Sequence, residues 1–362
     1  MIQLSDHFTY KRLLRFTFPS IIMMIFTSVY GVVDGFFVSN FVGKTPFAAV
    51  NLIMPVLMIL GCIGFMFGSG GAALISMTMG AGYPKKANEI FSMIVWVSAA
   101  LGILFGALGF LFLRPIASLL GAEGQLLENC VLYGRIILVS LPFYVLQFEF
   151  QCLFATAEKP KLGLYVTVAA GLTNMVLDAL FVAVFSWGIA AYGVLMYVCM
   201  IFLAIFIGYS VGVAPIVGYH YGARNHDELS GLLKKSLRMI AVCAVVMFAA
   251  GQFLASPLSR LFVGYDTELM EITTRAFVIF SFSFLFSGFS IFGSSFFTAL
   301  NDGLISALIA FLRTLVFQVI AVLVFPLIWG LDGIWFSIVG AEIMAITVTI
   351  SFLLFKREKY GY

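Results

Sequence analysis

Five ionisable residues lie well inside long apolar stretches of the sequence, away from the ends of the stretches, where a charge is costly. They are Asp34, Glu149, Asp178, Arg313 and Glu342. Insertion scales put this cost at about 2.5–3.5 kcal/mol at the centre of a membrane-spanning helix. Residues that carry such a cost are candidates for binding an ion or a substrate. Arg313 and Glu342 could also pair with one another.

Asp34 and Asp178 are expected at the same depth in the membrane. Asp34 lies about six residues before the outer end of its apolar stretch and Asp178 about eight before the outer end of its own, so both are roughly 9–12 Å below that end. Each has a polar residue four positions earlier, Tyr30 and Asn174 respectively. Residues four apart share a helix face. We therefore expect two short polar stripes that can meet within one helical bundle.

Two carboxyl groups in a region poor in water are suited to holding a cation. Desolvation favours the protonated carboxyl, and a neighbouring carboxylate favours it further. Oxygens from Asp34, Asp178 and Asn174 would also suit a hard cation such as Na⁺. The pattern predicts a site that couples H⁺ or Na⁺ to another process, with no further metal or cofactor. The alternative is that the two acids only fix helix packing.

Pro19 and Glu149 are weaker candidates. Pro19 interrupts the first apolar stretch below Asp34, and a proline inside a helix removes a hydrogen bond and bends the helix. It is therefore a candidate hinge, unless neighbouring groups simply satisfy the freed carbonyl. Glu149 lies nearer the other end of its stretch, between Gln147 and Gln151. It could attract a cationic substrate or, alternatively, snorkel to the membrane surface or pair helices.

The elements that must position these residues are membrane-spanning helices. Of 362 residues, 62% are hydrophobic and only 10% are charged, whereas about a quarter of a soluble domain is charged. The apolar stretches are continuous, which excludes the alternating strands of a membrane barrel. We predict an all-α polytopic membrane protein. The stretches long enough to cross the hydrocarbon are about 16–40, 47–79, 91–113, 132–155, 162–186, 190–219, 236–258, 273–299, 304–328 and 333–355.

Ten spans place both termini on one side of the membrane. If that side is the cytoplasm, the outer loops contain only Lys44, Arg114 and Arg260, and most of the other basic residues lie in cytoplasmic segments. This distribution satisfies the positive-inside bias. We therefore predict a protein of the cytoplasmic membrane with both termini in the cytoplasm. We also predict that the protein is a monomer.

Composition and motifs exclude several other classes of protein. The net charge of +3 leaves no basic surface on the scale that nucleic acid binding needs. The five cysteines lie singly in or beside apolar stretches, without Cys-x-x-Cys or Cys/His spacing. No His-Glu-x-x-His motif is present. We predict a protein that is not an enzyme and has no nucleic acid partner.

The sequence contains an internal duplication. A shift of 142 residues, without a gap, aligns Gly70 with Gly212, Gly80-Ala81 with Gly222-Ala223, Pro115 with Pro257, Thr156-Ala157 with Thr298-Ala299 and Trp187-Gly188 with Trp329-Gly330. The repeat units are 48–189 and 190–331, with four spans each. Because each unit has an even number of spans, both units enter the membrane in the same direction. The repeat is therefore parallel, with its axis along the membrane normal, and this plan is known in transporters. We predict two bundles, 1–189 and 190–362.

The repeat leaves its two ends unpaired. Residues 1–47 have no counterpart before the second unit, and residues 332–362 have none after the first. A symmetric parent would have twelve helices and about 440 residues. We favour loss of two central helices near Ile189-Ala190-Ala191. The alternative is a protein with ten helices from the outset, whose first and last helices have no counterpart in the other unit.

Four stretches resemble the multidrug and toxic-compound extrusion (MATE) family. They are FPSIIMMIFTSVYGVVDGFFV at 18–38, FGSGGAALISMTMGAG at 67–82, TNMVLDALFV at 173–182 and GVAPIVGYHYGA at 212–223. Members of this family usually have two six-helix lobes around a central cleft. The resemblance implies a secondary transporter that exports small molecules, often lipophilic cations, in exchange for H⁺ or Na⁺.

The same resemblance implies a set of site residues. In bacterial and archaeal relatives, a network in the first lobe matches Tyr30, Asp34, Tyr133, Asn174 and Asp178 of this chain. Protonation of Asp34 would change the bend of the first helix and so the cleft. The family network also uses the sixth helix, which this chain lacks. The alternatives are a flippase for a lipid-linked saccharide, from the same superfamily, and an inactive, internally deleted form.

Overall fold

The computed structural model describes residues 2–41, 44–178, 194–263 and 267–362. Within these ranges the regular elements are helices, without strands. They are α1 (Tyr10–Phe41), α2 (Lys44–Gly80), α3 (Pro84–Leu119), α4 (Gly124–Thr156), α5 (Pro160–Asp178), α6 (Val194–Gly222), α7 (His226–Val263), α8 (Thr267–Ser281), α9 (Phe284–Ala299), α10 (Gly303–Phe311), the π-helical segment η2 (Leu312–Val316), α11 (Phe317–Trp329), α12 (Leu331–Phe355) and α13 (Arg357–Tyr360).

These helices have the length and composition that a bilayer requires. Within the described residues eight helical spans are long and apolar enough to cross it, and α10, η2 and α11 together form one of them. The pair α8 and α9, bent by 51° at a short break, would make a ninth span. The described part of α5 ends at Asp178, inside the apolar stretch predicted over 162–186. The predicted all-α polytopic membrane fold is confirmed.

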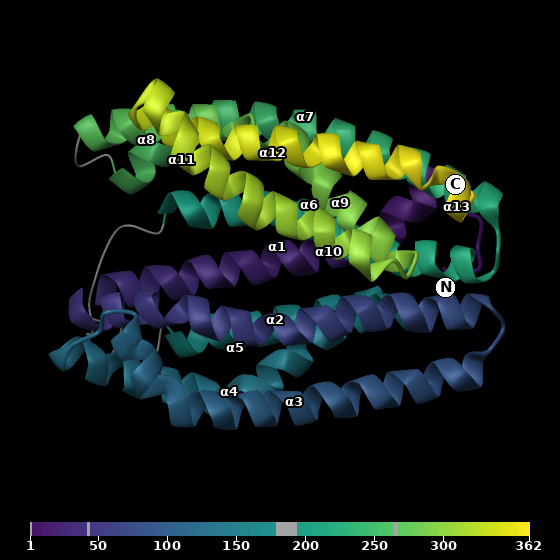
Figure 1. Cartoon of the computed structure of the whole chain (residues 1–362), viewed down its shortest axis with the longest axis horizontal. Coiled ribbons are helices and arrows are strands. Elements are labelled where there is room, and N and C mark those ends of the chain that lie inside the picture. The colour runs from purple at the N-terminus through teal and green to yellow at the C-terminus, as the bar shows by residue number, and fades with distance from the viewer. Residues whose placement is uncertain (1, 42–43, 179–193, 264–266) are drawn as a thin grey trace.

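The helices form two bundles that lie side by side along the long axis of the molecule (Figure 1). In the first bundle α4 packs against α2 and α3, and α5 packs against α1. In the second bundle α6 packs against α9, α7 against α8, and α11 against α12. Both α1 and α2 contact α6 and so join the bundles. The boundary predicted between the bundles, at 189–190, lies outside the described residues and stays a prediction.

Glycine allows the backbones of α2 and α6 to touch where the bundles cross. A Cβ atom on Gly80 would lie 2.0 Å from the carbonyl oxygen of Tyr219, and one on Gly222 would lie 2.0 Å from that of Met77. The repeat offset of 142 residues converts Met77 into Tyr219 and Gly80 into Gly222. The two contacts are therefore images of each other. This is the arrangement that a two-fold axis between parallel repeats produces.

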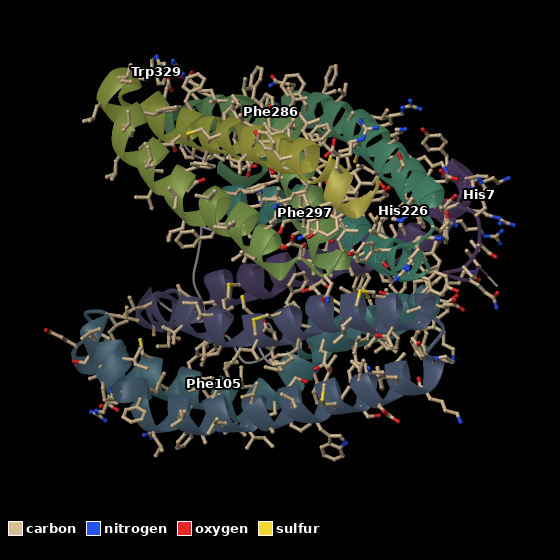
Figure 2. All side chains as sticks on the ribbon, turned by 45° about the vertical axis from the view of Figure 1, so that its right-hand side comes forward. His7, Phe105, His226, Phe286, Phe297 and Trp329 are labelled. Carbon is tan, nitrogen blue, oxygen red and sulfur yellow. The ribbon has the colours of Figure 1, made fainter. Side chains whose placement is uncertain are left out.

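The segment before α1 ties the two bundles together at the end of the molecule that carries both termini (Figure 1). The backbone N–H of Leu4 donates to Glu158 Oε1 at 2.7 Å, just after α4. The N–H of Phe8 donates to Glu228 Oε1 at 2.8 Å, in α7. Leu4 and Phe8 are themselves fully buried in the core of the second bundle. Figure 2 shows His7 at this end and Trp329 at the opposite one.

Candidate functional site

A cavity of about 380 Å³ lies where the two bundles meet. The first bundle contributes residues from α2 and α4, among them Phe65, Ser69 and Cys152. The second bundle contributes residues from α6, α9, α10 and η2. A site built from both repeats, near the middle of the spans, is where transporters of this plan hold their substrates. The cavity is therefore the candidate substrate site.

Hydroxyl groups give this cavity its polar character. Ser290, Ser294 and Thr298 are four residues apart along α9, so they share one helix face, and all three line the cavity. Ser294 and Thr298 each share a hydrogen bond with the Ser306 hydroxyl of α10, at 3.0 and 2.6 Å. The Oγ atoms of Ser210 and Ser290 are buried and have no hydrogen-bond partner in the described part of the chain. The hydrogen-bonding capacity of these two hydroxyls is therefore unused within the described residues.

One ion pair stands at the wall of the cavity. Arg313 of η2 lines the cavity and binds Glu342 of α12 through both Nε and Nη2, at 2.6–2.9 Å. Only 18% of the Arg313 side chain and 10% of the Glu342 side chain are exposed. The pairing that the sequence left possible is present. Because the guanidinium charge is neutralised within the wall, the pair adds no net charge to the cavity.

The predicted ion-coupling residues lie on helices that touch. Tyr30 and Asp34 belong to α1, Asn174 and Asp178 belong to α5, and α1 packs against α5. The side chains of these four residues lie outside the described part of the structure. Tyr133 is half-buried in α4 and packs against the apolar cluster at one end of the first bundle. The coupling site therefore stays a prediction.

Pro19 and Glu149 are both buried. Pro19 lies inside α1, where it also lines a second cavity. Glu149 Oε2 accepts a hydrogen bond from the Ser98 hydroxyl of α3, and Oε1 has no partner among the described residues. Glu149 thus faces the interior of the first bundle and is not among the residues that line the cavity between the bundles. The hinge and substrate roles of these residues stay predictions.

Gly208–Gly212 has the pattern Gly-x-Ser-x-Gly, which in hydrolases places a nucleophilic serine on a sharp turn between a strand and a helix. In this chain the motif lies within the continuous helix α6. Both glycines serve packing, because a Cβ on Gly208 would lie 2.6 Å from Cα of Ile21 and one on Gly212 would lie 3.0 Å from Cα of Thr17. The motif does not indicate an esterase.

The hydroxyl-lined cavity was not predicted from the sequence. The available signal was the spacing of Ser290, Ser294 and Thr298, which repeats every four residues along α9. Charged residues, by contrast, stand out in the sequence because a charge is costly in a membrane. Hydroxyls carry little cost in a helix, since they can donate to the carbonyl four residues earlier.

Two bundles built from a parallel repeat, with a cavity between them, define a polytopic membrane transporter. A family model described as MatE matches residues 19–180 and 186–324. The chain belongs to this family, the multidrug and toxic-compound extrusion transporters, and is a multi-pass protein of a cell membrane.

Individual relatives are similar over most of the chain. Multidrug export protein MepA of Staphylococcus saprophyticus is 22% identical over 435 residues, which cover 97% of this chain and 94% of that protein. MepA of Staphylococcus haemolyticus is 21% identical over 418 residues, 92% of this chain and 90% of that protein. The crystal structure of a MATE protein in complex with MaD3S has a TM-score of 0.87 at 18% identity, covering 98% of this chain and 97% of that one.

Proposed function

We propose that this chain exports small lipophilic or cationic molecules across the cytoplasmic membrane in exchange for H⁺ or Na⁺. The observation that carries the proposal is the cavity that both repeats line, in a chain whose two halves match the family model. Two parallel repeats that rock about a shared site can expose it to either side of the membrane in turn.

The lining of the cavity supports a broad range of substrates. Phe65, Ile207 and Cys152 supply apolar and polarisable surface, and the hydroxyls of Ser210 and Ser290 supply acceptors without a fixed charge. Aromatic and soft side chains adapt to ligands of different shape. A flippase for lipid-linked saccharides would instead need unpaired cations to bind pyrophosphate. The guanidinium of Arg313 is already held by Glu342.

We propose that binding of the coupling ion between α1 and α5 drives export. Asp34 and Asp178, with Asn174, Tyr30 and Tyr133, would bind the coupling ion, and Pro19 would let α1 bend in response. The packing of α1 against both α5 and α6 supports this route, because a bend in α1 would move its contacts with both bundles. The ion can shift the balance between conformations only through a difference in its affinity for them.

The coupling residues are tested by ethidium efflux from cells that express Asp34→Asn or Asp178→Asn. We expect efflux to lose its pH or Na⁺ dependence and to fall at least tenfold, because an amide can neither release a proton nor balance Na⁺. Glu128→Gln is the matched control, since Glu128 is an exposed carboxylate that pairs with Arg114 at the surface. If Asp34→Asn and unchanged protein depend equally on pH and equally on Na⁺, the coupling role is refuted.

The coupling ion is identified in proteoliposomes with one gradient imposed at a time. Ethidium uptake driven by a pH gradient in the absence of Na⁺ assigns H⁺, and uptake driven by a Na⁺ gradient at equal pH assigns Na⁺. Wild-type protein that responds to neither gradient, in vesicles where a characterised antiporter does respond, would show that the proposed exchange does not occur.

A further inference from the structure

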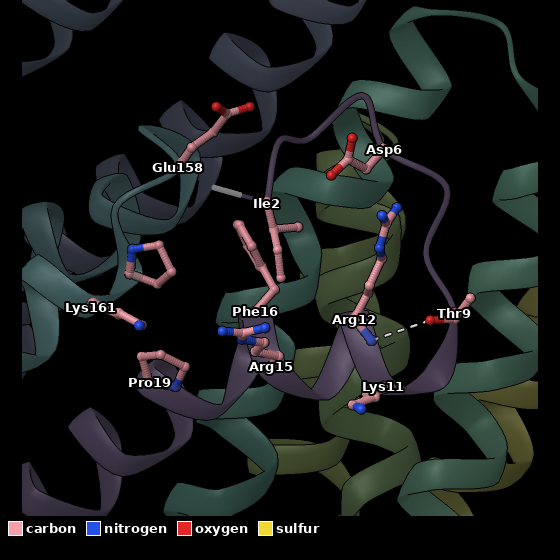
Figure 3. A pocket seen from close by; sticks show the side chains of 11 residues that line it. Ile2, Asp6, Thr9, Lys11, Arg12, Arg15, Phe16, Pro19, Glu158 and Lys161 are labelled. Atoms are coloured by element: carbon pink, nitrogen blue, oxygen red, sulfur yellow. Dashed lines mark hydrogen bonds between the residues drawn. The ribbon is translucent and has the colours of Figure 1, made fainter.

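A second cavity, of about 760 Å³, opens at the end of the molecule that carries both termini. The segment before α1, the first turns of α1 and the start of α5 line it (Figure 3). Four cationic side chains belong to its lining: Lys11, Arg12 and Arg15 from α1, and Lys161 from α5. All four are exposed. Two elements that are far apart in the sequence thus bring four positive charges to one cavity.

The acids in the same lining do not neutralise these cations. Asp6 accepts a hydrogen bond from the N–H of Gln3, and Glu158 accepts one from the N–H of Leu4. None of the ion pairs formed within the described residues joins either acid to the four cations. Arg12 donates from one Nη to the carbonyl of His7 and retains its other donors. The lining therefore carries two more positive than negative charges.

The surroundings of the cavity are apolar. Buried Phe16, Pro19 and Pro160 contribute to its lining. Large apolar side chains lie exposed along the next turns of both helices: Leu14, Phe18, Leu162 and Tyr165, with 46–67% of each residue accessible. On a membrane protein such side chains face acyl chains. The cations therefore lie at the level where the hydrocarbon begins, at the end that the positive-inside bias assigns to the cytoplasm.

We propose that this cavity binds the phosphate headgroup of an anionic phospholipid from the cytoplasmic leaflet. The guanidinium groups of Arg12 and Arg15 can each offer two N–H donors to phosphate oxygens, and Lys11 and Lys161 add point charges. The acyl chains lie along the exposed faces of α1 and α5. Basic pockets between membrane helices on the cytoplasmic side are suited to anionic headgroups. The adjoining apolar surface favours a lipid over a soluble phosphate.

The test measures lipid binding to the full-length protein in detergent by native mass spectrometry, with phosphatidylglycerol as the probe. Arg15→Gln/Lys161→Gln removes two cations from the cavity. Lys85→Gln/Lys234→Gln removes two exposed cations outside its lining and is the matched control. We expect the cavity variant to bind phosphatidylglycerol roughly 30-fold more weakly than unchanged protein. This is the loss expected when two cations near a membrane surface are removed. We expect at most a twofold change in the control.

Unchanged protein supplies a second test that needs no variant. Phosphatidylglycerol is expected to bind at least tenfold more tightly than phosphatidylcholine and at least tenfold more tightly than glycerol phosphate. An equal loss of binding in both variants would show general electrostatic attraction and overturn the proposal. Glycerol phosphate binding as tight as the lipid would assign the cavity to a soluble phosphate and also overturn it. Arg15→Lys/Lys161→Arg, which keeps both charges, is expected to keep most of the binding.

Discussion

Asp302 shows how one residue joins the C-terminus to the second bundle. Its carboxylate caps α10 by accepting from the N–H of Ile305, and it also accepts a hydrogen bond from the Tyr360 hydroxyl. The ammonium of Lys359 lies 3.6 Å away. Burial raises the pKa of Asp302, but the hydrogen bonds from Tyr360 and Ile305 and the charge of Lys359 more than offset it. The pKa therefore lies below its ordinary value of 3.8.

A lowered pKa makes a prediction about stability and pH. The charged form of Asp302 stabilises the fold above about pH 3.8, and this contribution is lost as the pH falls through the lower pKa of the folded protein. We expect Asp302→Asn to lower the melting temperature at pH 7, by the equivalent of about 1 kcal/mol. The difference from unchanged protein should narrow as the pH falls below 3.8 and through the lower pKa of the folded protein. Glu123→Gln, at an exposed carboxylate, is the control in thermal unfolding followed by fluorescence. A difference that does not narrow at all as the pH falls below 3.8 would contradict the assignment.

The ion pair of Arg313 and Glu342 leads to a second prediction at the scale of single residues. Glu342→Gln would leave a largely buried guanidinium without its countercharge, and breaking such a pair costs about 3–5 kcal/mol. We expect a lower melting temperature and weaker ethidium efflux, because the cavity wall gains a positive charge. The double variant Arg313→Gln/Glu342→Gln should recover part of the stability. Thermal unfolding of both single variants and the double variant measures this coupling, and strictly additive effects would show that the two residues act independently.

At the scale of helices, the contact of α2 with α6 depends on two glycines. A side chain at Gly80 or Gly222 would meet a backbone carbonyl that cannot move aside without shifting its helix. We expect Gly80→Ala and Gly222→Ala each to destabilise the protein by about 1–3 kcal/mol. Gly70→Ala is the matched control, because a Cβ there has no atom within 4 Å.

The same variants should also loosen the joint between the bundles. In a background without native cysteines, a Met77→Cys/Tyr219→Cys pair reports this approach through oxidative cross-linking. We expect Gly80→Ala to reduce the cross-linked fraction and Gly70→Ala to leave it unchanged. Equal cross-linking in all three proteins would mean that the glycines do not control the approach of α2 to α6.

The helices were predictable because each span must be apolar over its own length, whatever it packs against. The approach of Met77 to Gly222 was not, since it depends on where two distant helices cross. The same holds for the segment around Leu4 and Phe8. Its backbone donors pair with Glu158 and Glu228, and no local pattern links those positions. The pairing of Arg313 with Glu342 could be predicted, because an apolar setting offered so few partners.

The whole molecule is shorter than its relatives, and the difference lies within the chain. The alignment with MepA of Staphylococcus saprophyticus spans 435 positions and covers 97% of this chain, which has only 362 residues. Two helices with their loops would account for a difference of this size, in line with the loss of two helices that the duplication favours. The described bundles still pack against each other through α1, α2 and α6, and the cavity receives residues from both. The joint between the bundles therefore needs no helix beyond those described.

This independence leads to a prediction about transport by the whole chain. Because the substrate cavity and the α2–α6 contact are present, we expect cells that express the 362-residue protein to export ethidium above the level of cells with an empty vector. A version with a helix pair inserted between residues 189 and 190 should export faster, since those helices would shield the cleft from lipid and complete the predicted network around Asp34. Both proteins carry the same tag, and efflux is normalised to the amount in the membrane. If only the longer version exports ethidium, the 362-residue chain is the inactive form, and the cavity between its bundles is not sufficient for transport.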